Sequence, residues 1–464
     1  MNNIRGIPRL KARNDKKLLF CNSSKLVNIY NSNTQFLDLT NLILFMFKKF
    51  QPIASAFAPN YTLTDVFIAI KYLFFPWNWA KLQNGKYRRK LERRFCEFMD
   101  CRWAIGFDSG RSGLYAILKC LEIEKDDEII LQAFTTVALP NVITLCGAKP
   151  VYIDIEKNTY NINPEKIAEK ITSKTKAIVV QHTFGNPVEM DRIMEIVKKH
   201  NLYLIEDCAH SLGSEYQGKK MGTFGDAAFF SFGRDKVISS VSGGMVITSN
   251  SELGQKIKEF KNKISYPKKS LIMRQLLHPI ITFVSLKMYY FFSIGKIIMY
   301  LSSNTEIITK AYTKEEKASK KPENFPAKMP NALAKIAFHQ MKLINKFNNH
   351  RRDVAKLYEE RLVDDKSVEL PKISSGSKNV FLWYTILVEN KKALIKKANK
   401  RGIILGDWFP QVVGPIEVDI AKAGYRKGEC PIAEKVSSKC VNLPTHHNIS
   451  IEDAEKVAKV VNDY

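Results

Sequence analysis

The sequence predicts an α/β protein: a large domain around a mostly parallel central sheet, followed by a smaller C-terminal α+β domain. After residue 100, short apolar runs such as "DEIILQAF", "NVITLCG", "KAIVVQH" and "LYLIEDC" alternate with helical patterns such as "PEKIAEKIT" and "MDRIMEIVKKH". Continuous apolar strands separated by helices are typical of parallel sheets covered on both faces. From residue 331 the pattern is first helical and then mixes strands with helices, which indicates the second domain.

Four regions follow from the changes in pattern along the chain. Residues 1–85 are a basic, aromatic-rich extension that contains the amphipathic helix candidate "VFIAIKYLFFPWNWAKL". Residues 86–263 form the large domain, which begins with the helix "KYRRKLERRFCEFMD" and the strand "CRWAIGF". Residues 264–327 are an apolar and basic insertion, and residues 328–464 form a helical connection and the small domain.

The charge of the chain is unusual. The 464 residues carry a formal net charge of +26, of which residues 1–100 contribute +11 and residues 251–330 contribute +9. Such an excess indicates an anionic partner, namely a membrane surface, phosphorylated substrates or nucleic acid. No recognised nucleic-acid-binding module accompanies the charge, so we expect no nucleic-acid partner.

The cysteines and the N-terminus indicate a cytoplasmic protein. The eight cysteines are scattered, form no C-x-x-C pair and do not cluster with histidine, so we expect no metal site. Scattered cysteines in a long chain fit a reducing compartment. The basic start "MNNIRGIPRLKARNDKK" does not lead into the apolar core and cleavage site of a secretory signal.

The stretch "DSGRSG" (108–113) is the first of three polar stretches at predicted strand ends, where doubly wound sheets bind ligands. Gly110 permits a tight turn into a helix, and the main-chain N–H groups of Arg111 and Ser112 would then face an anion at the helix N-terminus. The Arg111 side chain could add a charge-assisted contact. A plain glycine-rich turn is the alternative, because short glycine patterns are weak signals.

The other two stretches carry a carboxylate and a lysine. In "LIEDCAH" (204–210), Asp207 ends an apolar strand, where a buried carboxylate needs a cationic partner; an exposed turn or a helix cap is the alternative. In "SFGRDK" (231–236), Lys236 is either a solvated surface lysine or a Schiff-base nucleophile with a lowered pKa, and Ser231 could bind a phosphate of the same ligand.

The order and spacing of these motifs resemble the DegT–DnrJ–StrS family of sugar aminotransferases, which are fold-type-I enzymes dependent on pyridoxal 5'-phosphate (PLP). The resemblance covers roughly residues 86–250 and 328–464 and includes "GAKPVYIDI", "LIEDCAHSLGSEYQGKKMGTFGDAAFFSF", "GGMVIT" and "CPIAEKVSSKCVNLPTHHNIS". It implies a fold-type-I PLP transferase that moves an amino group from an amino acid, by family habit L-glutamate, to a keto-sugar. The keto-sugar would be nucleotide-linked, and the pathway would be cell-envelope polysaccharide synthesis.

The resemblance also assigns roles to residues. It implies that Lys236 binds the cofactor as a Schiff base and moves the proton, and that Asp207 pairs with the pyridinium nitrogen. His210 would contact the ring or its phenolic oxygen. His182 would lie near the cofactor face, and the alternative for His182 is a core histidine. The remaining phosphate and ring contacts would be Gly110, Arg111 and Ser112 by main chain, Ser231 by hydroxyl, and Thr136. A homodimer is implied as well.

Several positions depart from the family pattern. Arg111 stands where the family usually has threonine, Thr136 where an aromatic ring often stacks on the cofactor, and Ser242 where glutamate precedes the Gly-Gly pair. The "NYRM"-like segment, which often serves the neighbouring subunit's site, reads "PAKM" at Pro326–Met329. These departures leave the substrate open. They also keep an alternative: a membrane-associated regulatory or scaffold protein of the same fold without turnover. A PLP sugar dehydratase is disfavoured, because that branch replaces the lysine with histidine.

The segment 270–303, "SLIMRQLLHPIITFVSLKMYYFFSIGKIIMYLSS", is apolar, aromatic and interrupted by basic residues. Lys287 and Lys296 inside the run argue against a simple membrane span, which needs about 20 mostly uncharged residues. Basic residues beside tyrosine and phenylalanine favour a helix or hairpin lying on an anionic membrane. The prediction is therefore a cytoplasmic protein peripheral on the inner face of the membrane. A buried hairpin or dimer contact, and a true span, are the alternatives.

Overall fold

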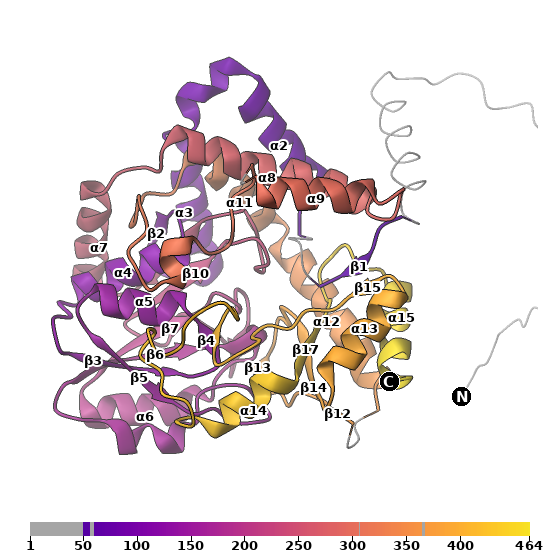
Figure 1. The fold of residues 1–464 in the computed structure, drawn as a ribbon. Coiled ribbons are helices and arrows are strands. Elements are labelled where there is room, and N and C mark those ends of the chain that lie inside the picture. Colours follow the sequence, from indigo (N-terminus) through magenta and orange to yellow (C-terminus); the bar gives the residue numbers. More distant parts are fainter. Residues whose placement is uncertain (1–49, 56–59, 306, 364–366) are drawn as a thin grey trace, which may run out of the picture. The chain divides into compact units, whose positions relative to one another are not determined.

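A seven-stranded sheet forms the frame of the structure, a computed structural model that describes residues 50–55, 60–305, 307–363 and 367–464 (Figure 1). The first 49 residues of the predicted extension lie outside the described part. The strand order in the sheet is β2-β11-β10-β7-β6-β3-β5. The bounds of these strands are β2 Trp103–Phe107, β3 Glu128–Gln132, β5 Lys149–Ile153, β6 Thr175–Gln181, β7 Tyr203–Asp207, β10 Ala227–Ser231 and β11 Gly244–Thr248.

The predicted, mostly parallel sheet is confirmed. Strands β5, β3, β6, β7 and β10 pair in parallel, and only β11 runs antiparallel to its neighbours β10 and β2. Because parallel crossovers are right-handed, helices on connections that run in opposite directions along the sheet cover opposite faces. Helices α4 (Gly110–Cys120) and α5 (Ala138–Leu145) accordingly lie on one face and α6 (Met190–His200) on the other (Figure 1).

Two sequence patterns were assigned the wrong local structure. The apolar run "NVITLCG", read as a strand, falls in helix α5, which connects β3 to β5 and buries Val142 and Ile143 against the core. The helical pattern "PEKIAEKIT" forms only two short 3₁₀ turns, Pro164–Lys166 and Ala168–Lys170. Short apolar runs cannot be assigned by periodicity alone, because buried helices and buried strands both look continuously apolar.

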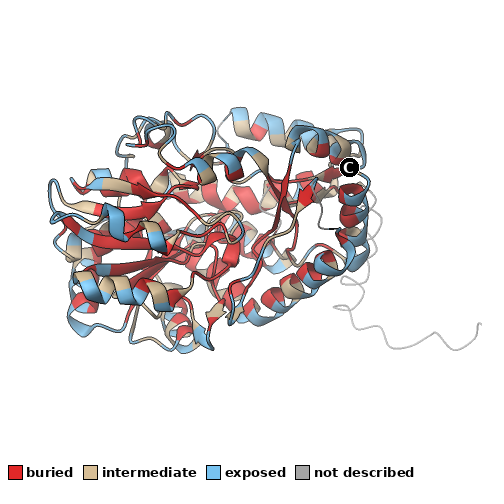
Figure 2. Ribbon diagram, turned by 90° about the horizontal axis from the view of Figure 1, so that it is seen from below, coloured by how far each residue is buried: buried red, intermediate tan, exposed pale blue. Residues whose placement is uncertain are grey.

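The small domain follows two long helices, α11 (Asn331–Lys342) and α12 (Ile344–Arg361). Its three-stranded antiparallel sheet has the order β12-β14-β17, and a separate apolar core lies between this sheet and helices α12, α13 and α15. Figure 2 shows buried residues concentrated in the strands and on the inner faces of the helices. The remaining bounds are β12 Val368–Glu369, β14 Tyr384–Val388, β17 Cys440–Leu443, α13 Lys391–Lys400, α14 Pro431–Lys439 and α15 Ile451–Asn462.

The described part of the predicted extension, residues 50–55 and 60–85, packs against the large and small domains rather than forming a separate domain. Strand β1 (Ile53–Ala54) pairs with β15 (Ile403–Ile404) of the small domain. Helix α2 (Leu63–Phe74) begins at a Thr62–Asp65 capping box and packs between α8 and α11, where Ile68, Tyr72 and Leu73 join an apolar cluster with Ile272 and Leu276. A short helix, η1 (Pro76–Lys81), and helix α3 (Lys86–Met99) lead from α2 into β2.

The predicted insertion forms a helical hairpin and a short third helix. Helix α8 (Lys269–Lys287) buries one face, whereas α9 (Ile294–Asn304) buries little besides Gly295 and Ser302; α10 is Lys314–Lys317. A Cβ atom at Gly295 would collide with the Ser285 carbonyl oxygen, so glycine is what lets the two helices approach. Among the described residues, no helix is long and apolar enough to cross a membrane.

One helix and several short strands lie around the central sheet. Helix α7 (Ser251–Lys263) packs beside β2 and β11. The paired short strands are β4 Thr135–Thr136 with β16 Val413–Gly414, and β8 Glu215–Tyr216 with β9 Lys219–Lys220 and β13 Ser377–Lys378, and a 3₁₀ turn, Thr183–Gly185, follows β6. Pairing of β4 with β16 connects the carboxyl edge of the central sheet to the C-terminal part of the chain.

Candidate active site

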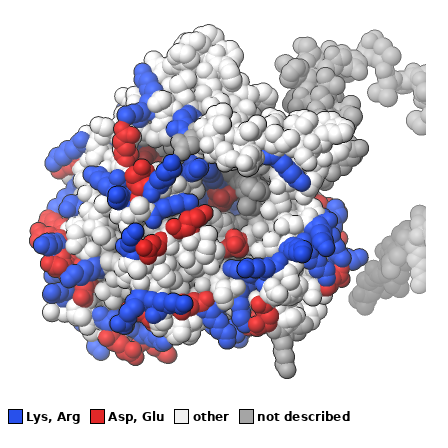
Figure 3. Space-filling view, in the orientation of Figure 1, with Lys and Arg blue, Asp and Glu red and all other residues white. Residues whose placement is uncertain are grey.

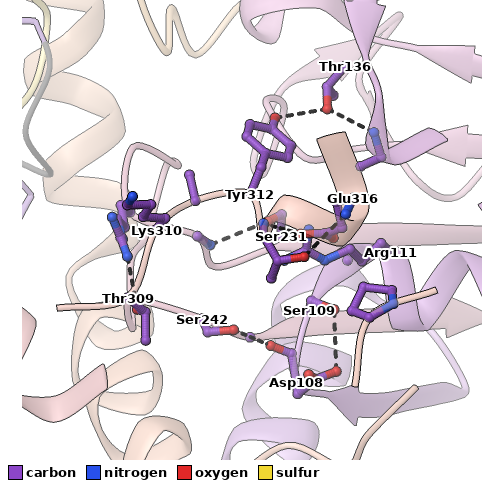
Figure 4. Close-up of a pocket in the computed structure, with 18 of the residues that line it drawn as sticks. Asp108, Ser109, Arg111, Thr136, Ser231, Ser242, Thr309, Lys310, Tyr312 and Glu316 are labelled. Carbon is purple, nitrogen blue, oxygen red and sulfur yellow. Dashed lines mark hydrogen bonds and ion pairs between the residues drawn. The ribbon is translucent and has the colours of Figure 1, made fainter. Parts of the chain in front are cut away.

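A cavity of about 810 Å³ opens at the carboxyl edge of the central sheet. It is lined by residues that directly follow or end β2, β7 and β10, together with residues of the insertion and of the C-terminal part. Figure 4 shows Asp108, Ser231 and Glu316 among the lining residues. The predicted site residues that line it are Gly110, Arg111, Thr136, Asp207, His210, Ser231 and Lys236. Residues that sequence reasoning singled out in separate parts of the chain therefore meet in one cavity.

The N-terminus of α4 faces this cavity. Ser109 is the N-cap residue and its Oγ accepts a hydrogen bond from the Ser112 N–H at 3.3 Å. Ser112 is fully buried and does not line the cavity, so its main chain is not free for an anion as the sequence suggested. The N–H groups of Gly110 and Arg111, which have no acceptor within the helix, remain for that purpose.

Glycines let the helix start lie directly on the sheet. A Cβ atom at Gly244, in β11, would lie 2.5 Å from the Gly110 nitrogen, and a Cβ atom at Gly110 would lie 3.3 Å from the Phe230 carbonyl oxygen. A side chain at Gly244 would displace the helix start, and one at Gly110 would make a tight contact with the sheet. The Gly-Gly strand start seen in the sequence thus serves to seat the anion-binding turn.

Asp207 and Lys236 are two of the charged residues that line the cavity. Asp207 is 3% exposed, its Oδ1 accepts a hydrogen bond from the Ala209 N–H at 2.9 Å, and it forms no ion pair within the described residues. Burial raises the pKa of the Asp207 carboxyl to about 6. Burial lowers the pKa of the Lys236 amine to about 8, although Asp207 and Asp235 oppose the shift. The lysine can therefore exist as a neutral amine near neutral pH, as a nucleophile must.

The two histidines have different places. His210 lines the cavity, stacks on Phe184 with ring centroids 5.8 Å apart, and is held neutral by burial, which lowers its pKa well below the usual range. His182 does not line the cavity: it is fully buried, its Nε2 lies 3.2 Å from Glu206 Oε2, and its Nδ1 accepts from the Val188 N–H. The core alternative for His182 is the one the structure favours.

His182, Glu206 and Cys208 also place potential metal-binding atoms within 4.8 Å of one another. The Glu206 carboxylate already accepts hydrogen bonds from the N–H groups of Gly222, Phe224 and Gly225 at 2.6 to 2.8 Å. This pattern fits a carboxylate that organises a buried loop. The absence of a metal site stays a prediction.

The insertion supplies part of the cavity wall, which sequence reasoning missed. Lining residues outside 108–236 include Leu271, Arg274 and Gln275 of α8 and the whole segment 308–316. Three side-chain contacts fasten segment 308–316 to the site: Arg234 Nη2 to Thr309 Oγ1 at 2.9 Å, Tyr312 Oη to Thr136 Oγ1 at 2.8 Å, and Arg111 to Glu316 (Figure 4).

Glu316 is the most informative of the missed residues. It is 3% exposed, forms an ion pair with Arg111, and closes a capping box with Thr313 at the start of α10. Its carbonyl oxygen accepts a hydrogen bond from Asn141 Nδ2 at 2.7 Å. The motif "TKEE" signals such a capping box in the sequence, but nothing in the sequence pairs it with Arg111.

Comparison with known proteins agrees with this geometry. Residues 77–275 and 303–462 match the DegT/DnrJ/EryC1/StrS aminotransferase family. The chain belongs to this family. The match leaves out residues 276–302, which are the second half of α8 and most of α9, so the helical hairpin is an addition to the family's common part.

Two curated relatives and one solved structure illustrate the similarity. An uncharacterized protein of Methanocaldococcus jannaschii is 34% identical over 80% of this chain and 88% of its own length. The GDP-perosamine synthase of Escherichia coli O157:H7 is 28% identical over 82% of this chain and 91% of its own. The structure of NtdA from Bacillus subtilis with bound cofactor PMP has a TM-score of 0.67 and 23% identity, and covers 88% of this chain and 84% of that one. The last comparison shows the fold.

The residues of this DegT-family site fit PLP, the cofactor of the family. A buried carboxylate at Asp207, without an ion-pair partner among the described residues, suits a cationic ring nitrogen, since burying a charge alone is costly. The α4 N-terminus with Arg111 and the Ser231 hydroxyl suits a phosphate. Lys236, in the same cavity and with a lowered pKa, suits the carbonyl carbon.

Proposed function

We propose that this DegT-family protein is a PLP-dependent aminotransferase that transfers an amino group from an amino acid to a nucleotide-linked keto-sugar in polysaccharide biosynthesis. The observation that carries this function is the presence of Lys236, Asp207 and the α4 N-terminus in one cavity. Relatives are named as a synthase of GDP-perosamine, a transaminase of a dTDP-linked amino sugar and a 3-aminotransferase of a UDP-linked sugar, which supports a nucleotide-linked acceptor. The alternative of a scaffold without turnover gives no reason for Lys236 and Asp207 to line one cavity.

The residues divide the work as follows. When bound, PLP supplies the carbonyl that the donor amine attacks and a ring that holds the electron pair left when a proton departs. Asp207 stays ionised beside a cationic ring nitrogen and so keeps the ring able to hold that pair. Lys236, as a neutral amine, would take the proton from the donor's Cα and give it back at a later stage of the transfer.

The anion-binding turn fixes the cofactor while these steps run. The N–H groups of Gly110 and Arg111 and the Ser231 hydroxyl would hold the phosphate, and His210, neutral and packed on Phe184, would limit the position of the ring. The donor loses its amino group and becomes a keto acid. The amino group takes the place of the ketone oxygen of the sugar. The family resemblance is the reason for assigning L-glutamate as the amino donor. The same resemblance leads us to propose a homodimer, and light scattering measures the oligomeric state.

Incubation with PLP, L-glutamate and a panel of nucleotide-linked keto-sugars, followed by mass spectrometry of the sugars, tests the function. Wild-type protein should give an aminated sugar and 2-oxoglutarate, and borohydride should attach the cofactor to the peptide that contains Lys236. Lys236→Ala should abolish both results. Lys310→Ala, which removes another lysine from the wall of the same cavity, is the matched control and should keep the borohydride reaction. Normal turnover by Lys236→Ala would refute the proposal.

We further propose that the protein works at an anionic membrane surface on the cytoplasmic side. Exposed large apolar side chains are concentrated on neighbouring helices in one region, which we call the apolar cap. Its members are Phe67, Phe74, Phe75, Trp77 and Trp79, in α2, η1 and the residue between them, and Val284, Phe292, Ile297, Tyr300, Leu301 and Ile307, in the hairpin and just after it. Phe292 is 83% exposed and Trp77 69%. In Figure 3 the surface over α2, α8 and α9 is mostly uncharged.

The chemistry of the apolar cap fits an interface between lipid and water. Tryptophan and tyrosine prefer the headgroup level, and lysines beside them can reach anionic phosphates. Lys296 lies over the rings of Tyr289 and Tyr290, with Nζ 5.4 and 4.8 Å from the two centroids, and Lys71 is exposed on α2. Because α8 contributes both to the apolar cap and to the cavity wall, membrane binding would bring the cavity close to the surface.

A further inference from the structure

Two side chains that are distant in sequence donate hydrogen bonds to the main chain of the turn that carries Lys236. The main-chain carbonyl of Lys236 accepts a hydrogen bond from Asn60 Nδ2 at 2.5 Å. The carbonyl of the next residue, Val237, accepts one from Arg351 Nη2 at 2.9 Å. Asn60 precedes helix α2 and Arg351 lies in α12, so two separate segments meet at this turn.

Asn60 and Arg351 also contact each other. Arg351 Nη2 donates to Asn60 Oδ1 at 3.3 Å, while Arg351 Nη1 donates to Asn348 Oδ1 at 3.3 Å. The Asn60 amide thus links the guanidinium to the main chain of Lys236. Both side chains are buried, with Arg351 at 0% and Asn60 at 2% exposure.

Arg351 is a buried cation whose contacts are all with neutral groups. Within the described residues it forms no ion pair, and it donates to amide and carbonyl oxygens. Burial lowers the pKa of its guanidinium to about 9. A charge is costly to bury without an ion-pair partner, so stability alone is a weak explanation for it.

A second set of contacts fixes Asn60 itself. Gln340 of α11 donates to the Asn60 carbonyl at 3.2 Å and accepts from the Ser239 N–H at 2.7 Å. The same Gln340 amide donates to Asp65 Oδ2 at 2.9 Å, and Asp65 Oδ1 lies 2.8 Å from His339 Nδ1. The network therefore reaches the main chain of the Lys236 turn at Lys236, Val237 and Ser239.

The turn needs such support because part of its backbone is in a disfavoured conformation. Val241 has a φ of 72°, in the left-handed region where a β-branched residue is strained. Ser239 Oγ accepts a hydrogen bond from the Val241 N–H at 3.3 Å, and the Ser239 N–H donates to Gln340. Ser239 therefore connects the strained Val241 to Gln340. Strain of this kind persists only where surrounding contacts determine the backbone.

We propose that Asn60 and Arg351 are positioning residues for Lys236, which hold the main chain of Lys236 and Val237 so that the lysine amine stays directed into the cavity beside Asp207. This inference rests on the proposed function, in which Lys236 binds the cofactor. Asn60 lies outside the residues that match the DegT family, 77–275 and 303–462, so here the preceding segment takes part in the site.

The test uses Asn60→Asp, which separates the two contacts of Asn60. The aspartate side chain keeps an oxygen that accepts a hydrogen bond from Arg351, and its negative charge pairs with the guanidinium. It lacks the N–H group that donates to the Lys236 carbonyl. The holoprotein should unfold at the wild-type temperature or above. The first half-reaction with L-glutamate, followed by the visible absorption of the cofactor in single turnover, should slow about tenfold to a hundredfold, because a misplacement of about 1 Å has effects of that size. The KM for glutamate should change little.

Arg351→Lys and Arg351→Met provide the second measurement. Lysine keeps the charge and can donate to Val237 but cannot span both acceptors, so it should retain more of the single-turnover rate than methionine. Tyr358→Phe is the matched control: Tyr358 lies on the same helix, is fully buried, and donates to the Pro444 carbonyl at 2.9 Å, away from the cavity. It should lower the melting temperature and leave the half-reaction unchanged.

The outcomes separate the inference from the function on which it rests. Wild-type rates and full borohydride attachment to Lys236 in both Asn60→Asp and Arg351→Lys would overturn the positioning role. If Asn60→Asp does not fold, the comparison of Arg351→Lys with Tyr358→Phe decides by the same criterion. Failure of borohydride to attach the cofactor to Lys236 in the wild-type protein would instead overturn the proposed function.

Discussion

Arg111, at the start of α4, forms an ion pair with Glu316, a residue 205 positions later in the insertion. The pair lies at the anion-binding turn, where the cofactor phosphate is expected. A phosphate bound at this turn would compete with Glu316 for the Arg111 guanidinium, and segment 308–316, which carries Glu316, lines the same cavity.

Glu316→Gln should strengthen binding of the phosphate group. Loss of the carboxylate leaves the Arg111 charge free for a phosphate, and a charge-assisted hydrogen bond is worth about 1.5–3 kcal/mol. We expect the Kd of PLP for the cofactor-free protein, measured by fluorescence, to fall about threefold to tenfold, since the loosened segment offsets part of the gain. Glu315→Gln makes the same charge change at the exposed neighbouring residue and should have little effect. Weaker binding by Glu316→Gln alone would show that the pair builds the site rather than competes for it.

Asp207→Asn should slow the proton-transfer steps by orders of magnitude while the cofactor still binds to Lys236. The amide cannot keep the ring nitrogen cationic, so the ring stabilises the electron pair poorly. Single-turnover rates with glutamate and with Cα-deuterated glutamate measure the effect, and the isotope effect should grow as proton removal becomes limiting. Near-normal rates would make Asp207 a structural carboxylate.

The same substitution should stabilise the cofactor-free protein in a pH-dependent way. Because the pKa of Asp207 is raised from 3.8 to about 6 in the folded state, the folded protein binds this proton more tightly than the unfolded chain does. The unfolding free energy of the wild-type protein should therefore fall as the pH rises from about 4 to 6 and then level off.

The amide of the Asp207→Asn variant has no proton to lose, so the gain in stability over wild type should be larger at pH 8 than at pH 4. The rise in the pKa of Asp207 corresponds to at most about 3 kcal/mol of unfolding free energy. Urea unfolding of the cofactor-free proteins at both pH values measures the difference. A gain that does not vary with pH would contradict the burial of this carboxylate in ionised form.

The apolar cap should bind anionic vesicles through its aromatic side chains. Replacing Trp77, Phe292 and Tyr300 together by serine removes well-exposed rings without touching the described core, and we expect binding to phosphatidylglycerol vesicles to weaken by at least about tenfold. Salt should weaken the wild-type binding without abolishing it, since the basic residues contribute about 1 kcal/mol each and the apolar contacts resist salt.

Tyr203→Ser is the control for vesicle binding, because Tyr203 is 42% exposed on β7, outside the apolar cap. Co-sedimentation is the measurement, and borohydride attachment to Lys236 should be unchanged in both variants. If the wild-type protein does not sediment with anionic vesicles at low salt, the cap would be better explained as a contact between copies of this chain.

Local patterns along the chain were enough for the main sheet and the centre of the site. Strands such as β6 and β7 are recognised because continuous apolar runs need burial on both faces, and Asp207, Ser231 and Lys236 because they stand at or just beyond the ends of such strands. Parallel strands bring their carboxyl ends to one edge, so order and spacing along the chain suffice to bring these residues together.

Only the tertiary structure decided the rest. Asn60, Glu316 and Arg351 lie in segments whose local patterns indicate helices or loops and nothing about partners, yet their contacts reach the main chain of Lys236 or the side chain of Arg111. The same limit explains His182, whose place in the core depends on Glu206 of the adjacent strand, and "NVITLCG", whose burial hid its helical period. Sequence pattern records which face of an element is buried, whereas the partner of a buried polar group is set by packing between elements distant in the chain.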